Sequence, residues 1–219
     1  MKLAIFNGSP RGQNSNTSLL LQNFKKGFEE NGGEIVSYDL LIRENRLEEQ
    51  LENFRKADCI FIAFPLYVDS LPGMVKKFIE TVGEFDGTNK NIFFLVHSGF
   101  PEAVHSRAVK KYLTFLAKQW KMNLLGIIVK PGSEGIRMRP EKANQKLFGQ
   151  FQQLGRSLAR NKTLDTNILQ QLEKPFKFPK FILLIFRLLK PTGFFDRYWN
   201  MKLKENDAYK NRFAAPYID

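Results

Sequence analysis

Residues 3–17 read LAIFNGSPRGQNSNT, in which four apolar residues run directly into a loop of glycine and small polar side chains. The run from Leu3 to Phe6 has the composition of a short buried strand, and Asn7-Gly8 is a turn signal. Apolar residues then recur at helical spacing from about Thr17 to Asn31, and Gly32-Gly33 can end that helix. The stretch therefore predicts a strand, a loop and a helix, which together form the repeating unit of an α/β protein.

The same alternation continues along the chain. Further strands are predicted at residues 35–40, 59–64, 92–96 and 124–129, and further helices at about 47–54, 73–82, 109–120 and 141–159. Crossovers between parallel strands are right-handed, so units of this kind bury both faces of a sheet by placing helices on each side. The predicted fold is therefore an α/β three-layer sandwich with a five-stranded parallel sheet. At this length we expect strand order 2-1-3-4-5. The ligand site then lies beyond the carboxyl ends of the first and third strands, where the order reverses.

Composition and charge limit the partners. The chain has 219 residues and a formal net charge of +12, and its 43% hydrophobic content is that of a globular protein rather than a disordered one. Residues 1–129 hold 16 Lys and Arg against 14 Asp and Glu, so the excess positive charge lies in the remainder. There the basic residues alternate with large aliphatic ones and no recognition module is present, so we expect no nucleic-acid partner.

The cellular compartment is predicted from two features. Cys59 is the single cysteine and stands in an apolar run, which indicates a buried structural thiol in a reducing compartment. No signal peptide is visible at the start, and no apolar run reaches the roughly 18 residues that a membrane span needs. We therefore expect a cytoplasmic protein.

The loop from Gly8 to Thr17 has the composition of an anion site. Glycines let backbone N–H groups approach a ligand, hydroxyl groups donate hydrogen bonds, and the following helix contributes a partial positive charge. A terminal phosphate monoester fits this description. The chain contains neither GxxxxGK[ST], the motif of nucleoside triphosphatases, nor GxGxxG, the motif of dinucleotide-binding proteins, which weakens both interpretations. An ordinary strand-to-helix loop with a helix cap is the alternative.

Two further loops fall at the same predicted sheet edge. Residues 65–73 are apolar, aromatic and stiffened by proline, which suits a flat heteroaromatic ring, although Tyr67 could simply pack against a helix end. Residues 97–102 again combine glycine, an aromatic residue and proline. A lone histidine at a strand end, such as His97, is more often structural than catalytic, so His97 is left without a role.

These motifs resemble a known family. The string Asn7-Gly8-Ser9-Pro10-Arg11-Gly12 with Ser15-Asn16-Thr17, followed by Pro65-Leu66-Tyr67 and Leu71-Pro72-Gly73, is similar to the NAD(P)H-dependent FMN reductases, which are flavodoxin-like oxidoreductases. The resemblance covers about residues 1–160 and implies a flavodoxin-like FMN-binding domain there. It implies phosphate binding by Ser9, Arg11, Ser15, Asn16 and Thr17, and contacts to the flavin ring from Pro65, Leu66, Tyr67, Val68, Ser98, Gly99 and Phe100.

The resemblance also implies an activity. A hydride would pass from NAD(P)H to FMN and on to a quinone, a flavin or another small acceptor. No catalytic side chain and no metal ligand are expected, since the cofactor carries the chemistry. The alternatives are an electron carrier of the flavodoxin type, which is typically acidic, and a flavodoxin-like scaffold without cofactor.

Residues 161–219 form a basic, apolar and aromatic C-terminal extension that we expect to be helical. Prolines bracket a helix-length apolar run from Phe181 to Leu189, which requires a partner surface. Burial in a homodimer is the favoured interpretation. Peripheral membrane contact through residues 175–199 is the rival, because lysines and arginines lie beside the aromatic residues.

Overall fold

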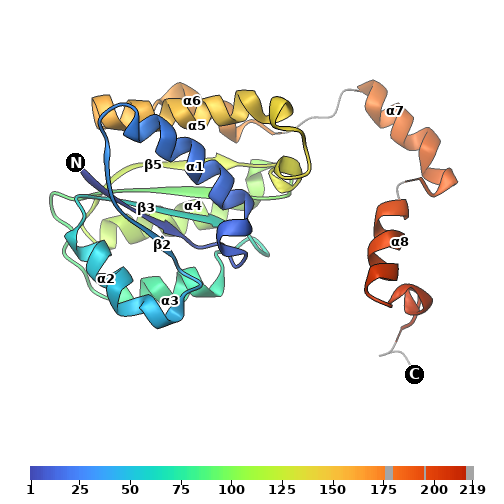
Figure 1. Cartoon of the computed structure of the whole chain (residues 1–219), viewed down its shortest axis with the longest axis horizontal. Helices are drawn as coiled ribbons and strands as arrows, with labels where there is room; N and C mark the ends of the chain where they lie inside the picture. Colours follow the sequence, from blue (N-terminus) through green and yellow to red (C-terminus); the bar gives the residue numbers. More distant parts are fainter. Residues whose placement is uncertain (176–179, 195, 216–219) are drawn as a thin grey trace. The chain divides into compact units, whose positions relative to one another are not determined.

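The computed structural model describes residues 1–175, 180–194 and 196–215 (Figure 1). The chain divides into two compact units, residues 1–176 and 177–219. They are called the sheet unit and the extension unit below.

The sheet unit contains one five-stranded parallel sheet with strand order β2-β1-β3-β4-β5, which confirms the prediction. Central strand β3 has hydrogen-bonded neighbours on both sides and helices over both faces, and all seven of its residues are buried. The thiol of Cys59 in this strand is buried as expected, and burial raises its pKa to about 12. The strands are β1 Lys2–Asn7, β2 Glu34–Leu40, β3 Cys59–Pro65, β4 Asn91–His97 and β5 Asn123–Lys130.

Six helices cover the sheet, three on each face (Figure 1). Side chains alternate along each strand, so Phe61 of β3 faces one helix layer while Ile60 and Ile62 face the other. Phe61 stacks on Phe93 with ring centroids 4.1 Å apart. One layer consists of α1 Asn16–Glu29, α5 Glu141–Asn161 and α6 Thr166–Glu173, and the other of α2 Leu47–Lys56, α3 Gly73–Val82 and α4 Arg107–Gln119.

Helices α1 and α5 cross at a pair of glycines. A Cβ atom on Gly27 would lie 1.9 Å from the carbonyl oxygen of Gln152, and one on Gly155 would lie 2.1 Å from that of Phe24. Both distances are far below van der Waals contact. The close approach of the two backbones therefore depends on glycine at both positions.

The compact sheet unit continues past the predicted domain boundary at residue 160. Helix α6 follows that position, and its Ile168 and Leu172 are buried in the same cluster as Phe61. Asp165 caps this helix by accepting hydrogen bonds from the N–H groups of Asn167 and Ile168. The compact sheet unit therefore includes α6, and the limit of the FMN-binding domain at residue 160 stays a prediction.

The extension unit is helical, as expected. It contains α7 Lys180–Leu189, which matches the apolar run between the two prolines, and α8 Asp196–Glu205. Most large apolar side chains of these helices are exposed, in contrast to those of the sheet unit. Among the described residues, no helix has the length and hydropathy needed to cross a bilayer. Part of the predicted contact region, residues 176–179 and 195, lies outside the described residues.

Candidate functional site

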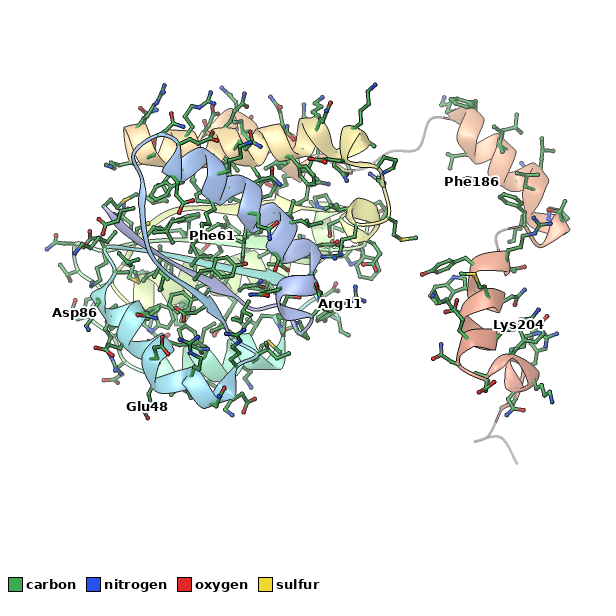
Figure 2. All side chains as sticks on the ribbon, in the orientation of Figure 1. Arg11, Glu48, Phe61, Asp86, Phe186 and Lys204 are labelled. Carbon is green, nitrogen blue, oxygen red and sulfur yellow. The ribbon has the colours of Figure 1, made fainter. Side chains whose placement is uncertain are left out.

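A small pocket lies at the carboxyl ends of β1, β3 and β4, where the strand order reverses. Its enclosed volume is about 60 Å³, and Arg11 lies at this edge of the sheet unit (Figure 2). Nine of the twelve residues predicted to bind the cofactor line it, whereas Thr17, Val68 and Phe100 do not. The lining residues are Ser9, Arg11, Ser15, Asn16, Pro65, Leu66, Tyr67, His97, Ser98, Gly99, Ser133 and Glu134.

One side of the pocket presents donors to an anion. Arg11 is exposed, and its guanidinium has no ion-pair partner in the described part of the chain. Ser9 is buried and accepts a hydrogen bond from the N–H of Arg11, which leaves its own hydroxyl proton available. Residues Asn16 and Thr17 begin α1, so their N–H groups have no partner within the helix. A cation, a hydroxyl group and the start of a helix therefore meet here, as the loop composition predicted.

The hydroxyl group of Ser15 has a structural role. Its oxygen accepts from the N–H of Ser18 and so caps α1, while its proton is donated to the carbonyl of Gly12 at 2.6 Å. Ser15 therefore lines the pocket without a proton to offer. The phosphate contact predicted for Ser15 stays a prediction, and this arrangement leaves no hydroxyl proton for it.

A buried network commits the hydroxyl of Thr17 in the same way. Ser133 Oγ donates to the carbonyl of Ser98 at 2.9 Å, so it accepts from His97 Nδ1 at 2.8 Å. His97 Nε2 then carries no proton and accepts from Thr17 Oγ1 at 2.7 Å. Only the backbone N–H of Thr17 remains for a ligand.

His97 is the centre of this network and stays uncharged. Burial lowers its pKa to about 3, and the charge of nearby Lys130 acts in the same direction. Both ring nitrogens are engaged by hydroxyl groups. The residue therefore connects the start of α1 with the loop after β5 and is not placed to exchange protons with a ligand.

Asn16 combines an engaged donor with an orphaned acceptor. Its side-chain NH₂ donates to the carbonyl of Ser133 at 2.9 Å and to that of Glu134 at 3.3 Å. Its Oδ1 is buried without a hydrogen-bond partner, and the residue is only 8% exposed. Because an unpaired buried acceptor is costly, this atom indicates a ligand that carries a donor, such as a hydroxyl group.

The loop after β3 supplies a second wall and a strained turn. Tyr67 and Ser70 exchange two backbone hydrogen bonds of 3.0 Å, which places Val68 and Asp69 at φ values of 47° and 57°. Positive φ is unfavourable for a β-branched residue. Val68 is 95% exposed at the tip of this turn and does not line the small pocket, so its predicted contact with the flavin ring stays a prediction.

Phe100, predicted to contact the flavin ring, follows two lining residues but does not itself line the small pocket. Its ring stacks on His105 with centroids 4.2 Å apart. His105 in turn pairs with Asp69, with Nδ1 and Oδ1 separated by 3.0 Å. This pair connects the loop after β3 with the segment after β4.

Two lining residues, Ser133 and Glu134, were missed by the sequence analysis. They follow β5, and Ser133 N–H donates to the carbonyl of Ser98 at 2.8 Å, which joins this loop to the one after β4. Because the fifth strand of a parallel sheet ends at the same edge as the others, the loop after it could have been predicted to line the pocket. Glu134 adds a carboxylate acceptor to the pocket wall, and its charge is opposite in sign to that of Arg11.

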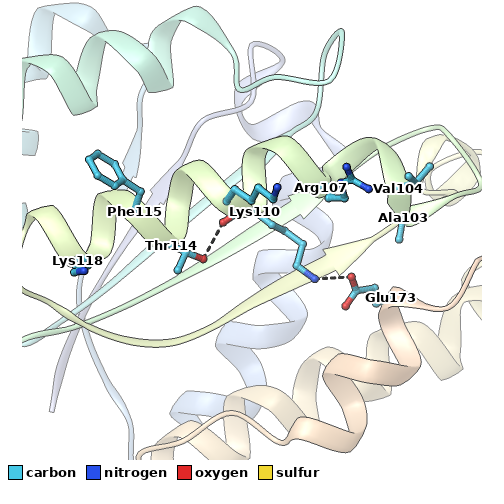
Figure 3. A pocket seen from close by; sticks show the side chains of 9 residues that line it. Ala103, Val104, Arg107, Lys110, Thr114, Phe115, Lys118 and Glu173 are labelled. Carbon is cyan, nitrogen blue, oxygen red and sulfur yellow. Dashed lines mark hydrogen bonds and ion pairs between the residues drawn. The ribbon is translucent and has the colours of Figure 1, made fainter.

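A larger hollow of about 600 Å³ lies along α4 (Figure 3). Arg107, Lys111 and Lys118 line it, together with Phe115, and Lys110 Nζ pairs with Glu173 Oε1 at 2.6 Å. This groove lies on the outer side of a helix and has no buried polar group that lacks a partner. The smaller pocket is the better candidate, because its donors and its orphaned acceptor converge at the strand ends.

Comparison with known proteins agrees with this fold. A family described as having a flavodoxin-like fold matches residues 1–156. A search of curated proteins finds no match.

Solved structures share the architecture at low sequence identity. An FMN-dependent NADH-azoreductase from Bacillus anthracis, solved in complex with FMN, has a TM-score of 0.57 at 15% identity, covering 73% of this chain and 99% of that one. An NADPH-quinone reductase from P. pentosaceus has a TM-score of 0.53 at 23% identity, covering 70% and 96%. An NAD(P)H:quinone oxidoreductase from Methanothermobacter marburgensis has a TM-score of 0.55 at 16% identity, covering 72% and 96%. Over a quarter of this chain lies outside these similarities.

Proposed function

Because the chain belongs to the family of proteins with a flavodoxin-like fold, we propose that it is an FMN-dependent NAD(P)H oxidoreductase. It would transfer a hydride from NAD(P)H to bound FMN and pass the electrons to a quinone, a flavin or another small acceptor. The observation that carries the proposal is the convergence of Arg11, Ser9 and the start of α1 beside the orphaned Asn16 Oδ1. The three similar structures support the class, since each is named as a reductase that uses NADH, NADPH or either.

The donor set fits FMN at two points. A phosphate dianion requires cationic and N–H donors, which Arg11 and the first turn of α1 provide. A ribityl chain carries hydroxyl donors, which match the unpaired acceptor of Asn16. The pocket volume of about 60 Å³ suits a phosphate-sized group rather than the whole cofactor.

Protein groups around the mouth would orient the ring. Tyr67 and Gly99 are exposed at the rim, and Pro65 and Leu66 are buried beside them. Bound FMN supplies the hydride-accepting chemistry. The chain would contribute binding, orientation and an acceptor at Glu134, and the neutral, doubly hydrogen-bonded His97 would hold the loops in place.

Purification under native conditions tests the proposal. Yellow protein that releases FMN on denaturation and oxidises NAD(P)H when a quinone is added supports it. Yellow protein without NAD(P)H oxidation would indicate an electron carrier, although the sequence pI of about 9.8 is unlike the typical acidic carrier. Colourless protein that rejects added FMN would indicate a scaffold.

Arg11→Ala tests which group is bound in the pocket. Loss of a charge-assisted contact to phosphate should raise the Kd for FMN by roughly tenfold or more and leave riboflavin binding unchanged. Titrations of both ligands by flavin fluorescence measure this difference. Arg55→Ala, an exposed position near the opposite ends of the strands, is the control. Equal weakening of FMN and riboflavin by Arg11→Ala would contradict the assignment of the phosphate.

Two predictions about the intact protein remain proposals. We expect a homodimer, which sedimentation of the full chain can test, and a cytoplasmic location, which cell fractionation can test.

A further inference from the structure

Helix α7 exposes apolar surface around most of its circumference. Leu183, Leu184 and Ile185 are consecutive, so they point in directions about 100° apart, yet all three are exposed. Phe181 and Leu188 extend the surface and are 64% and 67% exposed. Contiguous exposed apolar surface of this kind marks a site of contact with a protein or a membrane.

The charge around α7 has one sign. Residues 174–195 contain no Asp or Glu and five cations, Lys174, Lys177, Lys180, Arg187 and Lys190. A protein interface is usually depleted of charge at its centre. Cations beside an apolar helix instead complement an anionic surface, because lysine and arginine can place their charges at headgroup level while their stems stay in the apolar layer.

Aromatic residues at the start of α8 fit the same environment. Trp199 is 67% exposed and Tyr198 is 46% exposed, and their rings meet edge to face with centroids 5.6 Å apart. Each combines an apolar ring with one polar group, which is why tryptophan and tyrosine are enriched where lipid meets water.

A second copy of the chain is the other candidate for covering α7. In a two-fold contact the same patch lies on both sides, so two sets of these cations would face each other. The proposed surface offers one carboxylate, Asp196 at the start of α8, against these five cations. Such a contact brings like charges together, whereas an anionic lipid surface neutralises them.

The length of α7 determines how it could meet a bilayer. Ten residues span about 15 Å, about half the thickness of the hydrocarbon core. The helix can therefore lie in the interface but cannot cross it. From these observations we propose that α7 and the start of α8 form a peripheral anchor for anionic phospholipid. The proposal does not depend on the bound cofactor.

Vesicle flotation of the full-length protein tests the proposal. Binding to vesicles that contain phosphatidylserine should exceed binding to pure phosphatidylcholine vesicles by at least roughly tenfold, and it should weaken as salt is raised. Replacing Lys180, Arg187 and Lys190 with Gln should weaken binding by about fivefold for each cation removed. Equal binding to both vesicle types, or none, would overturn the proposal.

A second set of variants tests the apolar contact. Leu183→Ser, Leu184→Ser and Leu188→Ser together should reduce vesicle binding by roughly a hundredfold. Phe115→Ser, an exposed aromatic on α4, is the control and should bind as the unaltered chain does. Unchanged melting by circular dichroism shows that a loss of binding is not a loss of folding. An equal loss in the Phe115 variant would contradict the proposal.

Tryptophan fluorescence locates the contact and distinguishes lipid from a second copy. The chain has two tryptophans, and Trp120 is buried in the sheet unit, so a blue shift on adding anionic vesicles reports Trp199. Trp199→Phe should abolish the shift. A lipid-independent dimer that the triple-serine variant converts to monomer would show that a second copy covers α7, and the proposal would fail.

Discussion

Strand β3 of the sheet unit and helix α7 of the extension unit are both almost wholly apolar, yet one is buried and the other exposed. The sequence of β3 is CIFIAFP, and every residue in it is buried. The sequence of α7 is KFILLIFRLL, and Leu183, Leu184 and Leu188 are exposed. Apolar composition therefore indicates that a segment needs a partner, and the packed neighbours decide whether that partner is the protein's own core.

The charged residues in and around the two segments were the clearest difference in sequence. Strand β3 contains no lysine or arginine, whereas α7 contains Lys180 and Arg187. Burying an unpaired cation is costly, so a segment that carries several of them is poorly suited to a protein core. The same residues make α7 suited to a surface that is apolar inside and anionic outside.

The largest expected effect on the free energy of unfolding comes from a substitution in buried β3, compared with one in exposed α7. Phe61→Ala should lower the free energy of unfolding by about 4 kcal/mol, because it removes a fully buried ring that packs on Phe24 and Phe93. Leu188→Ala in α7 should change it by less than about 0.5 kcal/mol. Urea unfolding followed by circular dichroism measures both. Similar losses for the two variants would mean that α7 is as well packed as β3.

The glycine crossing tests how tightly the helix layer packs on the sheet unit. Gly155→Ala should lower the free energy of unfolding by about 3 kcal/mol, since its Cβ would lie 2.1 Å from a carbonyl oxygen of α1. Gly149→Ala is the control on the same helix. Nothing lies within 4 Å of its added Cβ, so it should stabilise the protein by about 0.5 kcal/mol or more through helix propensity. Stabilisation by both changes would contradict the close approach.

The sheet unit could be predicted because its signals were strong and mutually consistent. Five strands alternating with helices predicted a parallel sheet, and the strand order expected for this length agrees with the observed one. The predicted boundary at residue 160 stops before α6, which is only eight residues long. Leu164, Ile168 and Leu172 recur at helical spacing and are all buried, so the signal was present but short.

The location of the candidate site could be predicted from the sequence more accurately than the hydrogen bonds within it. Topology brings the loops after β1, β3 and β4 to one edge, so nine of the twelve residues line the pocket. Hydrogen bonding between distant side chains is not encoded in local sequence, and that is why the engaged hydroxyl group of Thr17 could not be anticipated. The hydroxyl group of Ser15 bonds only to residues three positions away, so its capping role was a local signal. The turn at Val68 could not be anticipated either, since valine is an unusual residue at positive φ.

The buried histidine predicts an acid sensitivity specific to the sheet unit, since both histidines of the chain lie there. The folded-state pKa of His97 is lowered to about 3, so the unfolded chain takes up the proton first as pH falls below about 6.5. Stability is full above that pH and declines until about pH 3. At pH 5 the loss should be about 2 kcal/mol relative to His97→Gln, as measured by urea unfolding at each pH. Parallel pH profiles would contradict a neutral buried ring.

The smallest expected effect concerns the limit of the sheet unit. Asp165→Ala removes the cap of α6 and should lower the free energy of unfolding by about 1 kcal/mol, whereas Asp165→Asn should cost only a few tenths. In a Trp199→Phe background, the fluorescence of Trp120 follows unfolding on the opposite sheet face. A shift in that signal requires α6 to unfold together with the sheet. An unchanged midpoint for Trp120 would place α6 outside the cooperative unit and return the boundary to about residue 160.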